Sequence, residues 1–230
     1  SLKGGMSELV ETLVSRLSGD LRLGTAITYM TPFEGGYKLE ISIGEEVVAD
    51  KVLIALPAYQ TASLLRHIAP QLSSELDSIR YIGTGTINLL YRTTDIPRPI
   101  EGYGLVIPRS EKRQINAITV SSTKFAYRSP EELTLMRIFF GGARTPTTFL
   151  LDDDESQSVV RHELHDLTGI TANPLLARIV RNKQATPQYD VGHLRKVDRI
   201  ERQLPPNIYV TGSAFRGVGV PDCIHQSQQI

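Results

Sequence analysis

The spacing of apolar residues divides the chain into helical and extended segments. Apolar residues recur three or four positions apart before Gly19, which predicts one helix with a single apolar face. The positions on that face are Met6, Leu9, Leu13 and Leu17. Residues 51–57 run apolar almost without interruption, which predicts a strand in a sheet covered on both faces. Shorter strands are predicted before it, over residues 21–30, 37–43 and 47–49.

A second set of elements occupies the middle of the chain. Helices are predicted over residues 58–68, 70–78, 156–167 and 194–203, and strands over residues 79–92, 114–122 and 133–140. These strands resume after helices and are joined by turns, which favours an antiparallel sheet in a second module. The predicted fold class is α+β, with a mixed or antiparallel sheet, flanking helices and part of an α/β domain.

The late stretch 207–224 holds the densest group of glycines in an apolar setting. A short buried strand ends at Val210, and Gly212, Gly217 and Gly219 then allow tight turns and close backbone approach. Pro221 opens a helix predicted over residues 223–229. A strand, a glycine-rich turn and a helix N-terminus together favour an anion-binding or cofactor-edge site. Such turns also occur with nothing bound, so a purely structural turn stays open at this point.

Composition excludes several classes of protein. The 230 residues contain 25 Lys+Arg and 25 Asp+Glu, so no net charge favours nucleic acid or an anionic membrane as partner. No apolar run reaches the roughly 18–20 residues of a membrane-spanning helix, and no signal peptide is visible. The single cysteine, Cys223, rules out an internal disulfide and suits a reducing cytoplasm. Packing against the glycine turn is favoured for Cys223 over a role as nucleophile.

Other candidate groups carry weaker signals. The acidic run 152–155 is favoured as a helix cap over a metal site. His162 and His165 lack a third ligand, so they are expected to face solvent, and no metal site is predicted. Phe125, with Lys124 and Arg128 beside it, offers an aromatic face flanked by cations, which suits a flat ring with carboxylate edges. Spacing alone favours a strand-end aromatic with solvated basic neighbours.

Several stretches together resemble the FAD-dependent protoporphyrinogen and coproporphyrinogen oxidases of haem synthesis, within the wider amine-oxidase-like flavoproteins. Gly212 to Cys223 is similar to their C-terminal flavin-binding motif. The sequence Pro187-Gln-Tyr-x-Val-Gly-His193 is the most specific of the internal markers, because amine oxidases proper usually have Pro-Tyr-Ser there. The other matching stretches are Gly4 to Met6, Asp50 to Pro57, Gly102 to Arg109 and Lys124 to Pro130. The N-terminal Gly-x-Gly-x-x-Gly fold of that family is absent, so the resemblance covers its C-terminal half.

The resemblance implies a division of the chain and a set of site residues. Residues 1–57 would be part of the FAD-binding domain, 58–205 the substrate-binding domain, and 206–230 the C-terminal FAD-binding strand, turn and helix. The implied cofactor-binding residues are Ile27, near the adenine, and Gly217, Val218, Gly219 and Val220 at the flavin. The implied substrate-binding residues are Gly104, Val106, Lys124, Phe125 and Arg128.

The implied activity is the oxidation of a porphyrinogen to a porphyrin, with FAD as cofactor and oxygen as electron acceptor. No catalytic side chain is implied, because the cofactor supplies the hydride chemistry. The expected location is the cytoplasm, with peripheral membrane association left open and the oligomeric state unspecified. This chain alone is expected to be inactive and free of FAD, because the resemblance covers only the C-terminal half of the family.

Alternatives remain at this stage. One is a non-catalytic binding module or orphan half-domain, because the phosphate-cradling turn is absent. Another keeps the flavin and replaces the porphyrinogen with an amine or a polyene. The sequence does not distinguish protoporphyrinogen from coproporphyrinogen as substrate.

Overall fold

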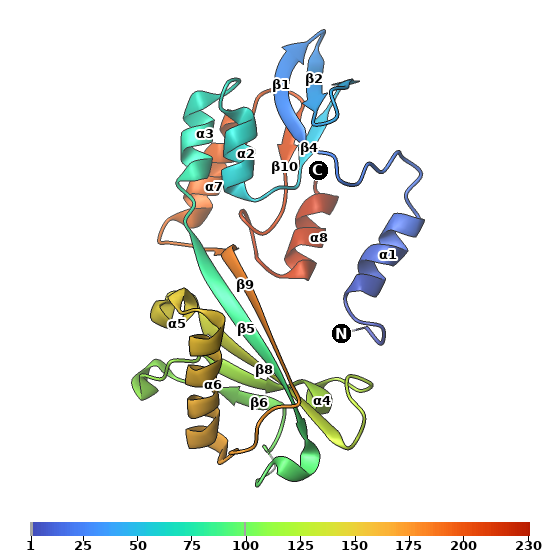
Figure 1. Cartoon of the computed structure of the whole chain (residues 1–230). Coiled ribbons are helices and arrows are strands. Elements are labelled where there is room, and N and C mark those ends of the chain that lie inside the picture. The colour runs from blue at the N-terminus through green and yellow to red at the C-terminus, as the bar shows by residue number, and fades with distance from the viewer. Residues whose placement is uncertain (1, 99) are drawn as a thin grey trace. The chain divides into compact units, whose positions relative to one another are not determined.

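The computed structural model describes residues 2–98 and 100–230, which form two compact units. Unit 1 comprises Ser1–Gly19 and Ile82–Ala185, and unit 2 comprises Asp20–Tyr81 and Thr186–Ile230. The chain therefore passes between the units after residues 19, 81 and 185. Figure 1 labels most of the helices and strands of both units.

Unit 1 is built on a five-stranded sheet. The strand order is β6-β7-β8-β5-β9, and the pairs β6–β7, β7–β8 and β5–β8 are antiparallel, as predicted. The strands are β5 (Tyr81–Arg92), β6 (Gly104–Val106), β7 (Ala117–Val120), β8 (Leu133–Gly141) and β9 (Leu176–Pro187). The long strands β5 and β8 form the middle of the sheet (Figure 1).

One face of this sheet packs against helix α6 (Asp153–Thr168). Alternate residues of β5 are buried on that face because successive side chains of a strand point to opposite sides. Val160 and Leu164 of α6 are at most 1% exposed and join the same cluster. The buried residues of β5 and β8 in this cluster are Ile87, Leu89, Tyr91, Met136, Ile138 and Phe140. The alternation predicted for residues 79–92 therefore identifies the side chains that β5 contributes to the core of unit 1.

The ends of α6 follow from the residues that flank it. Asp152 accepts a hydrogen bond from the Glu155 N–H at 2.8 Å, and Glu155 accepts one from the Asp152 N–H at 3.2 Å. This reciprocal pair satisfies two N–H groups that the first turn leaves without helical partners. Gly169 ends the helix with φ +77°, a left-handed conformation that glycine adopts without strain. The prediction that the acidic run caps a helix is confirmed.

The remaining helices of unit 1 are short. They are α1 (Ser7–Ser15), α4 (Ser121–Lys124) and α5 (Pro146–Leu150), with 3₁₀ turns η1 (Thr93–Asp95) and η2 (Arg109–Glu111). Helix α1 forms where predicted, and none of its residues is buried. Met6, Leu13 and Leu17 of the predicted apolar face are each 50–61% exposed, so this face lies largely open in the described part of the chain.

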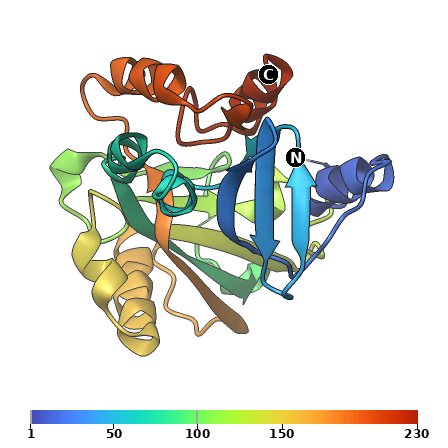
Figure 2. The same cartoon turned by 90° about the horizontal axis from the view of Figure 1, so that it is seen from above.

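Unit 2 contains two small sheets. Strands β1 (Ile27–Phe33), β2 (Gly36–Ile41) and β3 (Glu46–Ala49) form an antiparallel meander, and Figure 2 shows them side by side. Strand β4 (Val52–Ile54) pairs in parallel with β10 (Ile208–Val210). Residues far apart in the sequence thus share one sheet, with Leu53 opposite Tyr209.

The helices of unit 2 are α2 (Ala58–Leu65), α3 (Pro70–Asp77), α7 (His193–Gln203) and α8 (Val220–Gln228). The core joins α2, α3, α7 and the strands, and its largest fully buried side chains include Leu65, Leu72, Leu76 and Phe215. Helix α7 contributes Val197 and Ile200, both 0% exposed. None of the helices in residues 2–98 and 100–230 has the length and apolar character needed to cross a bilayer.

One expectation differs from this fold, and another is not tested by it. The strand expected to be covered on both faces leaves Leu53 52% exposed, because its neighbours Val52 and Ile54 point into the core of unit 2 and Leu53 points to the opposite face. The compact units meet after residues 19, 81 and 185, and the predicted division into cofactor-binding and substrate-binding domains, after residues 57 and 205, stays a prediction. Residues 58–81 and 186–205 pack with unit 2, and residues 2–19 belong with the sheet of unit 1. Which unit holds a cofactor stays a prediction.

Candidate functional site

The predicted site residues fall into two groups, one in each unit. The glycine loop, defined as Thr211–Gly219, lies in unit 2 between β10 and α8. The β6 edge, defined as Gly104–Val106 together with the segment Lys124–Arg128, lies in unit 1. Each group is described by itself.

The glycine loop contains two buried residues and two glycines with positive φ angles. Ala214 and Phe215 are each 2% exposed and belong to the core of unit 2. Gly212 has φ +119° and Gly217 has φ +151°, values that L side chains rarely adopt. A Cβ atom at Gly217 would lie 2.5 Å from the Cβ of Asp222, so this position accepts no larger residue without movement.

Side chains of unit 2 hold the backbone of this loop. The Tyr189 hydroxyl lies 2.8 Å from the Ser213 carbonyl oxygen and 2.9 Å from the Gly217 nitrogen. The Nε2 atom of His193 lies 2.9 Å from the Phe215 carbonyl oxygen. Burial raises the pKa of the Tyr189 phenol above its ordinary value, so the hydroxyl keeps its proton as a donor at neutral pH.

The end of the loop forms the start of α8. The Gly219 N–H donates to Asp222 Oδ2 at 3.1 Å, and the Cys223 N–H donates to the Gly219 carbonyl oxygen at 3.0 Å. Within the described residues, the N–H groups of Val218 and Val220 have no hydrogen-bond partner. The side chains of both valines are about half exposed, at 54% and 50%. Two unpaired N–H groups beside a helix N-terminus fit the carbonyl edge of an isoalloxazine ring.

A charged contact fixes the loop from a second side. The Arg216 guanidinium bonds Asp198 at 2.8 Å and bonds both carboxylate oxygens of Glu201. The hydrogen bonds that Arg216 donates to Glu201 and then to Asp198 raise the pKa of Arg216 above its ordinary value. All three side chains are about 40% exposed, so solvent screens much of this attraction. Both carboxylates are on α7, the helix that also carries His193.

Ile27 lines an open cavity of 610 Å³ beside the free edge of β4. The cavity is lined by residues of β1, β4 and α2, among them Val52, Ile54 and Leu64, with Thr25 and Gln60 supplying polar groups. Ile27 is 41% exposed. An apolar cavity with a few polar groups fits a flat heteroaromatic group such as adenine.

In unit 1, Gly104 allows β6 to lie against β7. Gly104 has φ +141°, and a Cβ atom there would lie 2.0 Å from the Ile118 carbonyl oxygen. Two backbone bonds frame the pairing: Val120 N–H to the Tyr103 oxygen at 2.9 Å, and Ile107 N–H to the Asn116 oxygen at 3.1 Å. The strand therefore presents Val106, 82% exposed, at the edge of the sheet.

Phe125 lies between two cations, as predicted. The ammonium nitrogen of Lys124 is 5.4 Å from the centre of the Phe125 ring, and the Arg128 guanidinium carbon is 5.8 Å from it. The ring is partly buried and follows directly after α4. The arrangement can bind a planar ring on the aromatic face and carboxylates on the two cations. The structure brings Lys124, Phe125 and Arg128 together; that they bind substrate stays a prediction.

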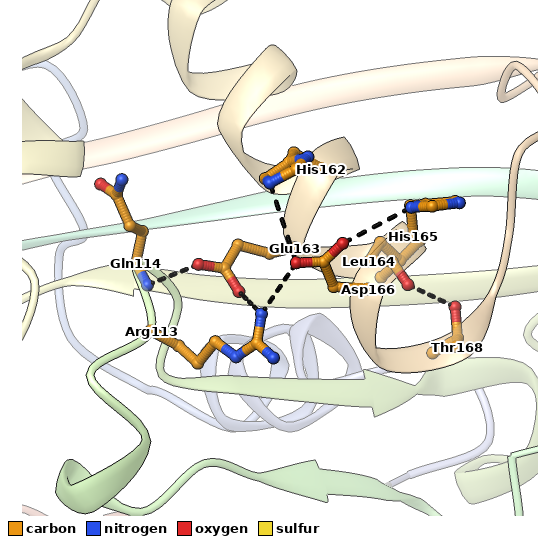
Figure 3. A network of polar contacts seen from close by, with 8 residues as sticks. All are labelled: Arg113, Gln114, His162, Glu163, Leu164, His165, Asp166 and Thr168. Atoms are coloured by element: carbon orange, nitrogen blue, oxygen red, sulfur yellow. Dashed lines mark hydrogen bonds and ion pairs between the residues drawn. The ribbon is translucent and has the colours of Figure 1, made fainter.

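A separate polar network fixes α6 to the loop before β7 (Figure 3). Arg113 donates to Glu163 at 3.2 Å and to Asp166 at 3.1 Å, and the Gln114 N–H donates to Glu163 at 2.9 Å. Glu163 is 6% exposed, and these bonds satisfy the charge that burial would otherwise disfavour. The hydrogen bond from Arg113 holds the pKa of the Asp166 carboxyl below its usual range.

His162 and His165 lie at the outer side of this network (Figure 3). Their ring nitrogens are 3.7 Å and 3.5 Å from the carboxylate of Asp166, and their side chains are 76% and 54% exposed. The expectation that both histidines face solvent is confirmed. Within the part of the chain that the structure describes, no three His, Cys, Asp or Glu side chains form a group suited to a metal ion.

The family model described as "Flavin containing amine oxidoreductase" matches residues 2–229. The chain belongs to this family. The flavin-containing amine oxidoreductase match covers both units, so the glycine loop and the β6 edge are parts of one family fold.

Relatives within the family are porphyrinogen oxidases. The chain is 29% identical over 231 residues to a coproporphyrinogen III oxidase of Bacillus subtilis, covering 97% of this chain and 49% of that protein. It is 30% identical over 234 residues to a coproporphyrinogen III oxidase of Propionibacterium freudenreichii, covering 99% and 43%. The chain thus spans about half the length of the curated relatives it matches.

A solved structure confirms the likeness in three dimensions. It is from Exiguobacterium sp. 255-15, provisionally assigned as a protoporphyrinogen oxidase, and superposes with a TM-score of 0.88 at 30% identity. The match covers 100% of this chain and 50% of that protein. The resemblance to porphyrinogen oxidases and the α+β fold class with antiparallel sheets are therefore confirmed.

Sequence reasoning missed the residues that hold the glycine loop. Tyr189 and His193 entered the prediction only as members of one marker stretch, with no role in holding this loop. In the structure both side chains contact carbonyl groups of the loop, and His193 is only 7% exposed. The only sequence signal was their shared position in the Pro-Gln-Tyr-x-Val-Gly-His stretch. Cys223 packs against the turn as predicted, with its sulfur 3.8 Å from the Gly217 carbonyl oxygen.

Proposed function

We propose that the chain is the C-terminal half of an FAD-dependent porphyrinogen oxidase, which converts a porphyrinogen to a porphyrin with oxygen as electron acceptor. The match of nearly the whole chain to about half of two coproporphyrinogen III oxidases carries the proposal. The unpaired N–H groups of the glycine loop and the aromatic face between two cations support it.

The cofactor part of the proposal rests on unit 2. The backbone at Gly217, Val218, Gly219 and Val220 would line the flavin, and Ile27 would lie at the adenine. Bound FAD would supply the hydride acceptor, which no side chain of this chain can replace. The two free N–H groups would donate to ring carbonyl oxygens, and the helix dipole of α8 would favour negative charge there.

The substrate part rests on unit 1. Phe125 would stack on a pyrrole ring, while Gly104 and Val106 would shape the wall beside it. Lys124 or Arg128 would pair with a propionate, because an ammonium or guanidinium group binds a carboxylate by charge-assisted hydrogen bonds. These residues would bind and orient the ring without transferring protons.

Coproporphyrinogen is the first substrate to test. Both curated relatives reported above carry that name, whereas the solved structure is provisionally a protoporphyrinogen oxidase.

The test uses the full-length gene product that contains this chain. Purified protein should show the absorbance bands of bound flavin and should generate porphyrin fluorescence and peroxide from coproporphyrinogen in air. Lys124→Glu should raise the KM for the porphyrinogen, while Lys112→Glu, on an exposed turn of the same unit, should leave it unchanged.

Two results would decide between this proposal and its alternatives. Protein that takes up no flavin in full-length form would favour a non-catalytic module. Flavoprotein that oxidises neither porphyrinogen but does oxidise an amine or a polyene would keep the cofactor and refute the substrate. The chain alone should show neither flavin absorbance nor activity.

A further inference from the structure

The hydrogen-bond partners of Tyr189 and His193 determine which atom carries each proton. Ser213 and Phe215 present carbonyl oxygens, which only accept hydrogen bonds. The Tyr189 hydroxyl must therefore donate to Ser213, and the His193 ring must carry a proton on Nε2 to donate to Phe215. The remaining lone pair of the Tyr189 oxygen then accepts from the Gly217 N–H at 2.9 Å.

The two rings also support each other. Tyr189 and His193 stack with ring centres 3.8 Å apart and planes 13° from parallel. They are four residues apart, and Gly192 between them has φ +89° at the start of α7. Because α7 is anchored in the core through Val197 and Ile200, the stacked pair is fixed to the rigid part of unit 2.

We propose that Tyr189 and His193 are positioning residues that hold the glycine loop in its cofactor-binding conformation before any cofactor arrives. They contact every second residue along the loop: the carbonyl groups of Ser213 and Phe215 and the N–H of Gly217. Val218, whose N–H is unpaired in the described residues, follows directly after the last of these contacts. The direction of that N–H is therefore set by the peptide group at Gly217.

This inference rests on the proposed function, because it takes the glycine loop as the flavin contact. It adds a role for two residues outside the loop that neither touch the substrate nor transfer protons. A loop held in advance pays less entropy when the cofactor binds, so loss of the contacts should appear as weaker FAD binding.

The experiment compares three variants of the full-length protein. Tyr189→Phe keeps the stacked ring and removes the hydroxyl, and His193→Phe keeps a ring and removes the Nε2 donor. Tyr29→Phe is the matched control: Tyr29 also packs on a histidine of unit 2, His67, with ring centres 5.2 Å apart. Its hydroxyl has no hydrogen-bond partner among the residues the structure describes.

Two readouts are measured on each variant. The first is amide hydrogen exchange in residues 211–219 of apoprotein, which needs no cofactor. The second is the affinity for FAD, followed by quenching of its fluorescence. In Tyr189→Phe the Gly217 amide should exchange faster than in wild type, and FAD affinity should fall about tenfold, equivalent to about 1.4 kcal/mol. His193→Phe should act in the same direction, and Tyr29→Phe should match wild type in both readouts.

The outcomes separate this inference from the function on which it rests. Unchanged exchange in Tyr189→Phe and His193→Phe would overturn the positioning role, whatever the protein binds. Faster exchange with unchanged FAD affinity would also overturn it, because the loop would then not need to be held. Wild-type protein without any FAD affinity would instead refute the proposed function, and with it the cofactor part of the inference.

Discussion

Substitution of Gly104 by alanine tests how the β6 edge is built. The added Cβ atom would lie 2.0 Å from the Ile118 carbonyl oxygen, whereas ordinary contact begins at 3.4 Å. The obstructing atom belongs to the backbone of β7, so no side-chain rotation relieves the overlap. Strand β6 must move away from β7, or the backbone at residue 104 must leave φ +141°.

The magnitude follows from two costs. A left-handed or similarly rare φ costs a residue with a side chain about 1–3 kcal/mol. Moving β6 weakens at least the nearer framing bond, from Val120 N–H to the Tyr103 oxygen, which is worth about 1 kcal/mol net. We therefore expect Gly104→Ala to destabilise unit 1 by about 2–4 kcal/mol.

Gly102 provides a matched control two residues away. It has φ +76°, yet no atom lies within 4 Å of its added Cβ atom. Gly102→Ala therefore has the conformational cost without the overlap, and the entropy lost from the unfolded chain is the same for both substitutions. The left-handed conformation costs alanine about 1–2 kcal/mol and the unfolded-state entropy returns about 0.4–1 kcal/mol, so the expected loss for Gly102→Ala is at most about 1.6 kcal/mol.

Thermal unfolding followed by circular dichroism measures the difference. For a chain of this length, 2 kcal/mol corresponds to a shift in Tm of about 4–8 °C. Hydrogen exchange at residues 103–107 locates the change on β6, and the KM for the porphyrinogen should rise in Gly104→Ala alone. Equal Tm values for the two variants would contradict the claim that Gly104 is required for close approach of the strands.

Three further predictions concern single contacts. Because the folded-state pKa of Asp166 is lowered, its contribution to stability is present above its unfolded pKa of about 3.9 and is lost as pH falls through the lower folded value. Arg113→Gln removes the largest cause of this lowering and should weaken the acid dependence of Asp166 in urea titrations between pH 6 and 2, while His162 and His165 still lower the pKa. Arg216→Lys should lose the paired bonds to Glu201 and destabilise unit 2 by about 0.5 kcal/mol, less at 1 M salt, and an effect that does not respond to salt would argue against an ionic origin. Phe125→Leu should keep the Tm within about 2 °C, because the ring is partly exposed, and should raise the KM for the porphyrinogen; a changed Tm with unchanged KM would show a structural role only.

The sequence predicted elements well where periodicity reflects burial on one face. Alternation over residues 79–92 matched β5 because that strand lies in the middle of a sheet with one face on α6. The strand predicted over residues 21–30 instead begins at Ile27. Leu21 and Leu23 are 48% and 82% exposed, so apolar character there does not indicate pairing.

Tertiary contacts also ended a strand earlier than its sequence predicted. Residues 114–122 were expected to be extended, yet β7 ends at Val120 and α4 follows. The Ser122 hydroxyl accepts a hydrogen bond from the Leu135 N–H at 3.3 Å, in the neighbouring strand β8. This contact between residues 13 positions apart supports the turn, and no local pattern signals it.

Site residues close together in sequence were easier to predict than those joined by folding. Lys124, Phe125 and Arg128 lie within five positions, so a turn of any kind brings their side chains near each other. The glycine loop was likewise visible as a local cluster. Its supports were not, because Tyr189 is 24 and 28 residues from its two partners and His193 is 22 residues from Phe215.

Helix α7 explains how such distant supports act on one loop. Asp198 and Glu201 are three residues apart and so lie on the same side of α7, where both reach Arg216. His193, at the start of the same helix, reaches the carbonyl group of the preceding residue, Phe215. One helix therefore fixes both the backbone and a side chain of the glycine loop, at adjacent positions. A loop that offers bare N–H groups to a cofactor cannot hold itself through them, so residues whose polar groups meet its carbonyl oxygens must be sought elsewhere in the fold.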